Sequence, residues 1–311
     1  MKPILRVPLV AIAGGAANMI LHGILSPLQP ADLPQTPGFF EAHGLLVPAI
    51  CCWELLAFTA FALTFLLLEA RMGSSSLVRG LLFGAAVGGL YFVGMFESLL
   101  LLGTAPVNEA LMGVADLASF LIAGLILGRT GYHQTRSAPR LRALPGVVAV
   151  ATIAGCYLAG RLLGAALLGI RSAWVTQPLG TLCWTLSLGV WVGVMYLLLE
   201  PALPHRPLTR ASSFALGVFG TTWLINHLFI GVAIGFSLDL VERVAVDTVS
   251  VWLAVIMIET ISQRFPRHRT SLPMKGVRCG VPSDAHSVED WASCSANRAV
   301  ARQTREAGPL A

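Results

Sequence analysis

The sequence has few charged residues. Asp, Glu, Lys and Arg together make up only 12% of it, whereas soluble globular domains carry roughly 25%. Lysine occurs just twice, at Lys2 and Lys275, while 55% of the residues are apolar and the mean hydropathy is +0.74. So few charged groups cannot cover a water-exposed surface of a chain this long. This excludes an ordinary soluble domain and predicts an integral membrane protein.

The sequence also lacks the apolar and polar alternation of membrane strands. A barrel needs a lumen-facing residue at every second position, but the apolar runs here are continuous. A bilayer core of about 30 Å is crossed by about 20 apolar residues in a helix. The predicted fold is therefore all-α, with eight transmembrane helices at residues 5–25, 42–68, 79–103, 107–128, 145–169, 174–199, 210–236 and 239–262.

Basic residues are concentrated beside every second loop. Lys2 and Arg6 lie at the start of the first span, and arginine also lies between spans two and three, four and five, and six and seven, and after the last span. Such loops stay in the cytoplasm, so both termini are predicted to be cytoplasmic. This bias accounts for the net charge of +5 without a nucleic-acid partner. Arginine in place of lysine, with abundant Ala, Gly and Leu, favours a bacterial inner membrane.

The chain repeats itself. Residues 52–128 align with residues 183–259 at a constant offset of 131, matching Cys52-Trp53 with Cys183-Trp184 and Asp116 with Asp247. A repeat of four helices predicts a parallel duplication, related by a pseudo-two-fold axis along the membrane normal. The predicted parts are a first four-helix repeat at 1–128, an Arg-rich cytoplasmic linker at 129–144, a second four-helix repeat at 145–262 and a disordered cytoplasmic tail at 263–311.

Two ionisable residues occupy equivalent positions near the middle of the membrane. If Asp116 and Asp247 face each other across the pseudo-two-fold axis, they share a cavity. Two carboxylates in low dielectric cannot both ionise cheaply, so one holds a proton. This arrangement predicts a small-solute carrier coupled to protons. The alternative is that each aspartate is hydrogen-bonded within its own four-helix unit.

Three further buried charges are candidates for substrate binding. Glu54 aligns with Thr185 in the second repeat, so this charge is present in one half only. A single substrate bound between the halves requires such a difference between them. Arg161 is predicted to be the only basic residue well inside a span. It needs a carboxylate partner, for which Glu97 is the candidate, or an anionic ligand such as a carboxylate or phosphate.

The histidines suggest a second class of function. His22, His43 and His227 all fall on the outer side of the predicted bundle, and imidazole is a common zinc ligand. A bound zinc ion would make the protein an intramembrane hydrolase, whereas His22 and His227 as axial ligands would hold a haem. No spacing motif such as H-E-x-x-H supports either cofactor. A non-catalytic scaffold or accessory subunit is the third alternative, and a carrier without resident cofactor remains the leading prediction.

Overall fold

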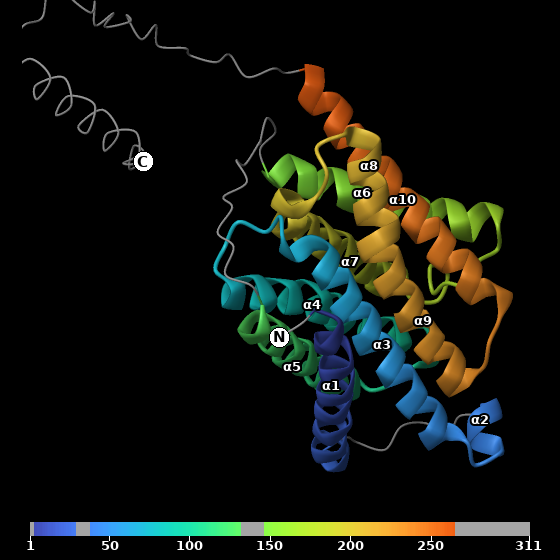
Figure 1. Ribbon diagram of the computed structural model, residues 1–311. Helices are drawn as coiled ribbons and strands as arrows, with labels where there is room; N and C mark the ends of the chain where they lie inside the picture. The colour runs from blue at the N-terminus through green and yellow to red at the C-terminus, as the bar shows by residue number, and fades with distance from the viewer. Residues whose placement is uncertain (1–2, 29–37, 132–145, 265–311) are drawn as a thin grey trace, which may run out of the picture. The chain divides into compact units, whose positions relative to one another are not determined.

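The computed structural model describes residues 3–28, 38–131 and 146–264, and over these ranges the chain forms helices and no strand (Figure 1). Eight helical segments there are long and apolar enough to cross a membrane, which confirms the predicted number. Residues 132–144 of the predicted linker, residue 145 of the predicted second repeat and residues 265–311 of the predicted tail lie outside the described residues. Seven of the spans consist of α1 (Pro3–Leu25), α3 (Leu46–Glu69), α4 (Ser76–Leu102), α5 (Pro106–Thr130), α6 (Gly146–Leu167), α7 (Pro178–Leu199) and α10 (Leu238–Arg264).

Proline and glycine set several of the helix boundaries. Pro106 and Pro178 begin α5 and α7. Proline suits the first position of a helix, because an N–H group there would form no hydrogen bond within the helix. Gly103 ends α4 with a φ of 70°, a left-handed conformation that favours glycine. The remaining short elements are η1 (Ser26–Leu28), α2 (Phe39–Ala42) and η2 (Glu200–Ala202).

The seventh span contains a π-helical segment. It begins as α8 (Pro207–Ser212), continues as the π-helix η3 (Ser213–Gly220) and ends as α9 (Thr221–Ile234). π-helical turns are rare and often lie next to functional side chains. Here the wider turns end just before Trp223 and His227, which belong to the charged cluster described below.

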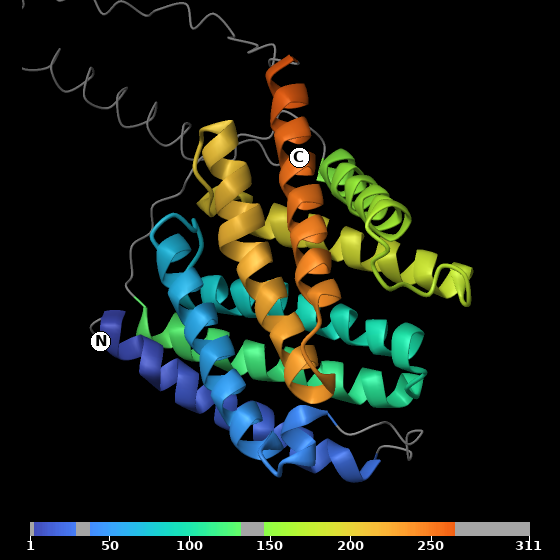
Figure 2. The same ribbon diagram turned by 90° about the vertical axis from the view of Figure 1, so that its right-hand side faces the viewer.

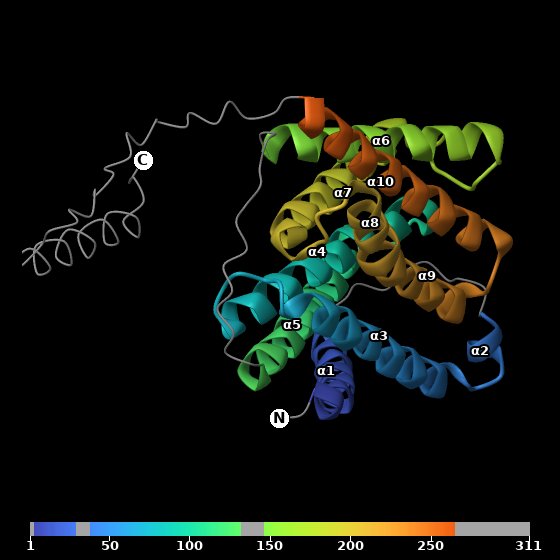
Figure 3. The ribbon, with the colours of Figure 1, turned by 45° about the horizontal axis from the view of Figure 1, so that its top comes forward.

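The eight spans pack in an order that closes on itself. Following the principal contacts, the order is α1, α3, α9, α10, α6, α7, α4 and α5, and α5 contacts α1 again. Figure 2 shows α9 between α3 and α10, with α4 and α5 crossing behind them. Figure 3 shows α7 and α4 lying between α6 and α5. Helices from the first and second halves of the chain therefore meet at two contacts, α3 with α9 and α4 with α7.

Small residues allow the closest of these contacts, between α4 and α5. A Cβ atom on Gly84 would lie 2.5 Å from the carbonyl oxygen of Phe120, so no larger residue fits there without moving the backbone. Close approach of this kind is how helices associate in a membrane. Buried aromatic rings fill the space beside it, with Phe120 packed against Phe58 and Tyr91.

At one end of the bundle, buried ion pairs join helix ends. Arg6 Nη1 lies 2.7 Å from Glu69 Oε2, which ties the start of α1 to the end of α3. Arg210 Nη1 lies 2.8 Å from Glu259 Oε1, which ties α8 to the end of α10. Each of these ion pairs joins the start of one span to the end of another, so the two spans that it joins run in opposite directions.

Candidate functional site

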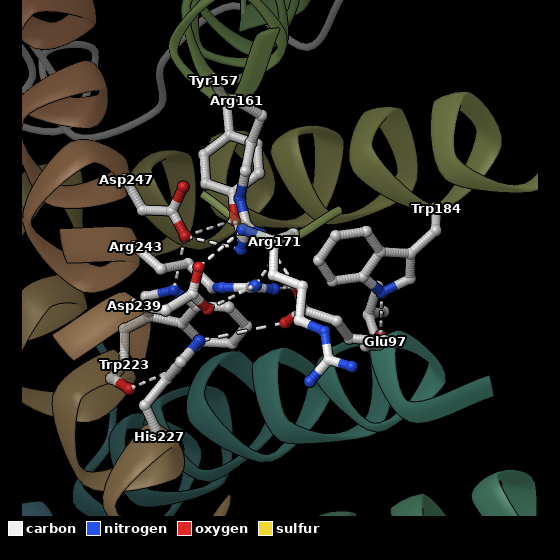
Figure 4. Close-up of polar contacts among 11 residues, drawn as sticks. Glu97, Tyr157, Arg161, Arg171, Trp184, Trp223, His227, Asp239, Arg243 and Asp247 are labelled. Atoms are coloured by element: carbon white, nitrogen blue, oxygen red, sulfur yellow. Dashed lines mark hydrogen bonds and ion pairs between the residues drawn. The ribbon is translucent and has the colours of Figure 1, made fainter. Parts of the chain in front are cut away.

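A cluster of buried charged residues lies toward the other ends of the spans, and Glu97 is at its centre (Figure 4). Glu97 belongs to α4 and is 4% exposed. Its Oε1 accepts hydrogen bonds from Arg161 Nη1 of α6, at 2.8 Å, and from Arg243 Nη1 of α10. The predicted ion pair between Arg161 and Glu97 is therefore present, and one carboxylate oxygen serves two guanidinium groups.

Arg161 also binds Asp247, which is fully buried. Arg161 Nη2 lies 2.6 Å from Asp247 Oδ2, and the same oxygen accepts hydrogen bonds from Tyr157 Oη at 3.0 Å and Trp223 Nε1 at 2.7 Å. The guanidinium carbon of Arg161 lies 5.0 Å from the centroid of the Trp184 ring, a cation–π geometry. Residues from α6, α7, α9 and α10 thus fix the position of this arginine.

Arg161 is not the only buried basic residue of the cluster. Arg243 lies in the second turn of α10 and is 3% exposed. It donates to Glu97, to Asp239 Oδ2 at 2.9 Å and to the carbonyl oxygen of Arg171. Asp239, Arg243 and Asp247 are spaced by four residues, so the sequence already placed them on one helical face.

His227 of α9 completes the cluster. Its Nδ1 donates to the carbonyl oxygen of Trp223 at 3.0 Å, which leaves Nε2 facing Glu97 Oε2 at 3.9 Å. The cluster thus contains two guanidinium groups, three carboxylates and one imidazole. Such groups are costly to bury unless they are paired, and here each guanidinium group meets two carboxylates.

The cluster borders a hollow beside the connection between α6 and α7. This hollow has an empty volume of about 350 Å³, which includes open solvent, and Glu97, Arg161 and Arg243 line it together with Thr181, Trp184 and Thr185. Thr185 is fully buried, and its hydroxyl has no hydrogen-bond partner among the described residues. Thr181, by contrast, donates to the carbonyl oxygen of Gln177 at 2.8 Å. The hollow therefore combines two arginines, a glutamate and a free hydroxyl.

Asp116 lies in a separate group. Its Oδ1 accepts a hydrogen bond from Asn18 Nδ2 at 2.8 Å and lies 3.1 Å from His22 Nε2, both on α1. Asp247 has no residue in common with these contacts. The expectation that Asp116 and Asp247 share a cavity is therefore wrong, and each aspartate is bonded within its own group of four spans. Glu54 lies near Asp116 rather than near Arg161.

The three histidines do not meet. His22 lies against Asp116, His227 lies against Glu97, and His43 is exposed and bonded to the carbonyl oxygen of Phe39. Among the described residues no group of three His, Cys, Asp or Glu side chains is placed to hold a metal ion. The described residues therefore do not form the histidine site that the zinc and haem hypotheses require.

Comparison of the chain with models of known families, with curated proteins and with solved structures found no match.

Proposed function

We propose that the protein is a carrier that moves a small solute bearing a carboxylate across a bacterial inner membrane, coupled to protons. The observation that carries this proposal is the cluster around Glu97, which borders a hollow and draws its residues from both halves of the chain. Each charge inside a span costs at least ~2.5 to 3.5 kcal/mol on insertion scales. A scaffold that only needs to pack has no use for so many of them, whereas a solute site between two halves does.

The predicted duplication supports a site at this position. The closed order of contacts stays the same when α1, α3, α4 and α5 are exchanged for α6, α7, α9 and α10. The contacts between the halves are also paired. Trp53 Nε1 of α3 donates to the carbonyl oxygen of Ile225 in α9 at 2.7 Å, and its repeat equivalent Trp184 of α7 donates to that of Val93 in α4 at 3.0 Å. Rocking of one half against the other would act on both contacts and on the cluster between them.

The predicted orientation places the cluster toward the outer side. In that orientation the ion pairs of Arg6 with Glu69 and of Arg210 with Glu259 lie at the cytoplasmic end, and both termini are cytoplasmic. The hollow beside Glu97 then opens outward, where a solute would enter. Closed ion pairs at one end and a hollow at the other are what an outward-facing carrier requires.

The residues of the hollow favour a solute with a carboxylate. A guanidinium group matches a carboxylate in shape and charge, and Thr185 supplies a hydroxyl donor beside the two arginines. The cluster has two guanidinium groups and three carboxylates. The guanidinium group of Arg171, at the rim of the hollow, brings the total charge close to zero. A solute that also carries an ammonium group would leave this balance unchanged, with Glu97 as its acceptor.

Uptake by purified protein in proteoliposomes tests this function. The panel consists of short monocarboxylates, small amino acids and inorganic phosphate as radiolabelled solutes, with empty liposomes as the blank. Thr185→Val removes the free hydroxyl at constant shape and is expected to raise KM about tenfold, because a hydrogen bond to a charged group is lost. Thr181→Val is the matched control, since its hydroxyl is already bonded to Gln177, and its KM should stay unchanged.

The two substitutions separate the possible failures. Equal KM values for Thr185→Val, Thr181→Val and the unmodified protein would remove the hollow from the substrate path. Uptake of no member of the panel above the empty-liposome blank would overturn the proposed carrier of a carboxylate solute.

A further inference from the structure

A second pair of buried acidic residues lies outside the cluster around Glu97. Glu54 of α3 and Asp116 of α5 are each 4% exposed and lie near the middle of their spans. Both border α1, because the Cβ atom of Glu54 would lie 3.3 Å from a Cβ on Gly15 and Asp116 is bonded to Asn18. Gly15 and Asn18 are three residues apart on α1 and so lie on one face of that helix, which means that both carboxyl groups lie beside the same part of α1. They therefore form one local pair.

No cation balances this pair. In the part of the chain that the structure describes, the hydrogen bonds and ion pairs of Glu54 and Asp116 include no guanidinium or ammonium group, and the imidazole of His22 is the only basic partner. The contrast with Glu97 is sharp, since that carboxylate meets both Arg161 and Arg243. Two adjacent carboxylates at membrane depth cannot both stay ionised without a cation.

The hydrogen bonds distinguish the two carboxyl groups. Asp116 Oδ1 accepts a hydrogen bond from Asn18 and faces His22, and such bonds stabilise an ionised carboxylate. Glu54 Oε2 is buried and has no hydrogen-bond partner among the described residues. We infer that the Glu54–Asp116 pair is a proton-binding site, in which Glu54 holds the proton and Asp116 stays ionised.

His22 gives this site a route to water. Its Nε2 contacts Asp116 Oδ1, while 26% of its side chain is exposed. It lies in the last turn of α1, at the end where the hollow beside Glu97 opens. A proton therefore passes from outer water to the imidazole of His22, then to the Asp116 carboxylate, and finally to Glu54.

The other polar groups around the pair have partners of their own. Tyr91 of α4 lies near both carboxyl groups, but its hydroxyl contacts the carbonyl oxygen of Thr222 at 3.5 Å. On α9, which packs against α3, the titratable group is His227, and it lies against Glu97. On α5, the other acidic residue is Glu109, in the first turn. The pair is thus left with His22 as its proton exchange partner.

Infrared spectroscopy of the purified protein tests the site directly, because a protonated carboxyl group has its own carbonyl stretching band. The unmodified protein at pH 7 should show this band, shifted in heavy water, and Glu54→Gln should lose it. Asp116→Asn should keep the band, since Glu54 retains its proton. Glu41→Gln, at an exposed glutamate of α2, is the control and should leave the band unchanged.

Glu54→Gln is also expected to fold normally, because glutamine resembles the protonated form in shape and charge. A band that survives in Glu54→Gln, or no band at pH 7 in the unmodified protein, would overturn the inference. The binding of the proton does not depend on transport, but its use in coupling rests on the proposed function. In proteoliposomes Glu54→Gln should lose accumulation driven by a pH gradient and keep exchange of solute for solute.

These readouts separate the two proposals. A Glu54 band in a protein that transports nothing would support the proton site and contradict the carrier. Uptake driven by a pH gradient with no Glu54 band would support the carrier and contradict the proton site.

Discussion

Replacing Glu97 with glutamine should strongly destabilise the folded bundle. Glu97 Oε1 accepts from Arg161 at 2.8 Å and from Arg243, and Glu97→Gln keeps the size of the side chain while removing its charge. Breaking a buried ion pair by removing one partner costs about 3–5 kcal/mol. The lower end applies here, because the amide oxygen still accepts one hydrogen bond and both arginines keep a second carboxylate, Asp247 or Asp239.

Unfolding in mixed detergent micelles, titrated with sodium dodecyl sulfate and followed by circular dichroism, measures this difference. A loss of about 3 kcal/mol lowers the folding equilibrium constant by about two powers of ten. The exposed Glu41→Gln should change stability by no more than about 0.5 kcal/mol. A double-mutant cycle with Arg243→Gln should give a coupling energy above about 1 kcal/mol, since the two side chains are in contact. A loss below about 1 kcal/mol for Glu97→Gln would contradict the ion-pair account.

Three further outcomes are expected. Gly80→Ala should lower stability by about 1–3 kcal/mol in the same assay, because its Cβ meets the backbone of α5, whereas Gly155→Ala, with open space around it, should raise stability by up to about 1 kcal/mol. Tyr196→Phe should cost about 1.5 kcal/mol through loss of the hydrogen bond to Glu259, and an unchanged unfolding midpoint would contradict that bond. In a variant without native cysteines, Ser75→Cys should react with an impermeant thiol reagent only from the cytoplasmic side and Val175→Cys only from outside, and the opposite pattern would reverse the proposed orientation.

The spans could be predicted from sequence because the physical signal is strong. A helix that crosses a bilayer needs a long apolar run, and the eight runs of this chain are separated by charged, proline or glycine residues. The π-helix from Ser213 to Gly220 could not be predicted in this way, since its composition is that of any apolar helix. The short helix α2 (Phe39–Ala42) was not predicted, because its four residues are too few to give a periodic signal, and the apolar run that begins at residue 42 placed the start of the second span four residues before that of α3.

The partners of the buried charges were harder to predict. Arg161 and Glu97 could be matched by depth and opposite sign, and they are bonded. The error with Asp116 and Asp247 came from the assumption that equivalent residues face the pseudo-two-fold axis. Their positions along the predicted spans could be read from the sequence, but the helical face on which each lies depends on packing, and Asp116 is bonded to α1 whereas Asp247 is bonded to α6.

That placement explains why two equivalent aspartates differ chemically. Asp116 is bonded to the neutral amide of Asn18 on α1, whereas Asp247 is bonded to the guanidinium of Arg161 on α6. An amide stabilises a carboxylate without cancelling its charge, so the group around Asp116 needs a proton to approach neutrality. A guanidinium cancels the charge outright, so the group around Asp247 needs none. One difference between α1 and α6 is therefore enough to leave Asp116 without a cation, so that its neighbour Glu54 holds a proton, and to commit Asp247 to an ion pair.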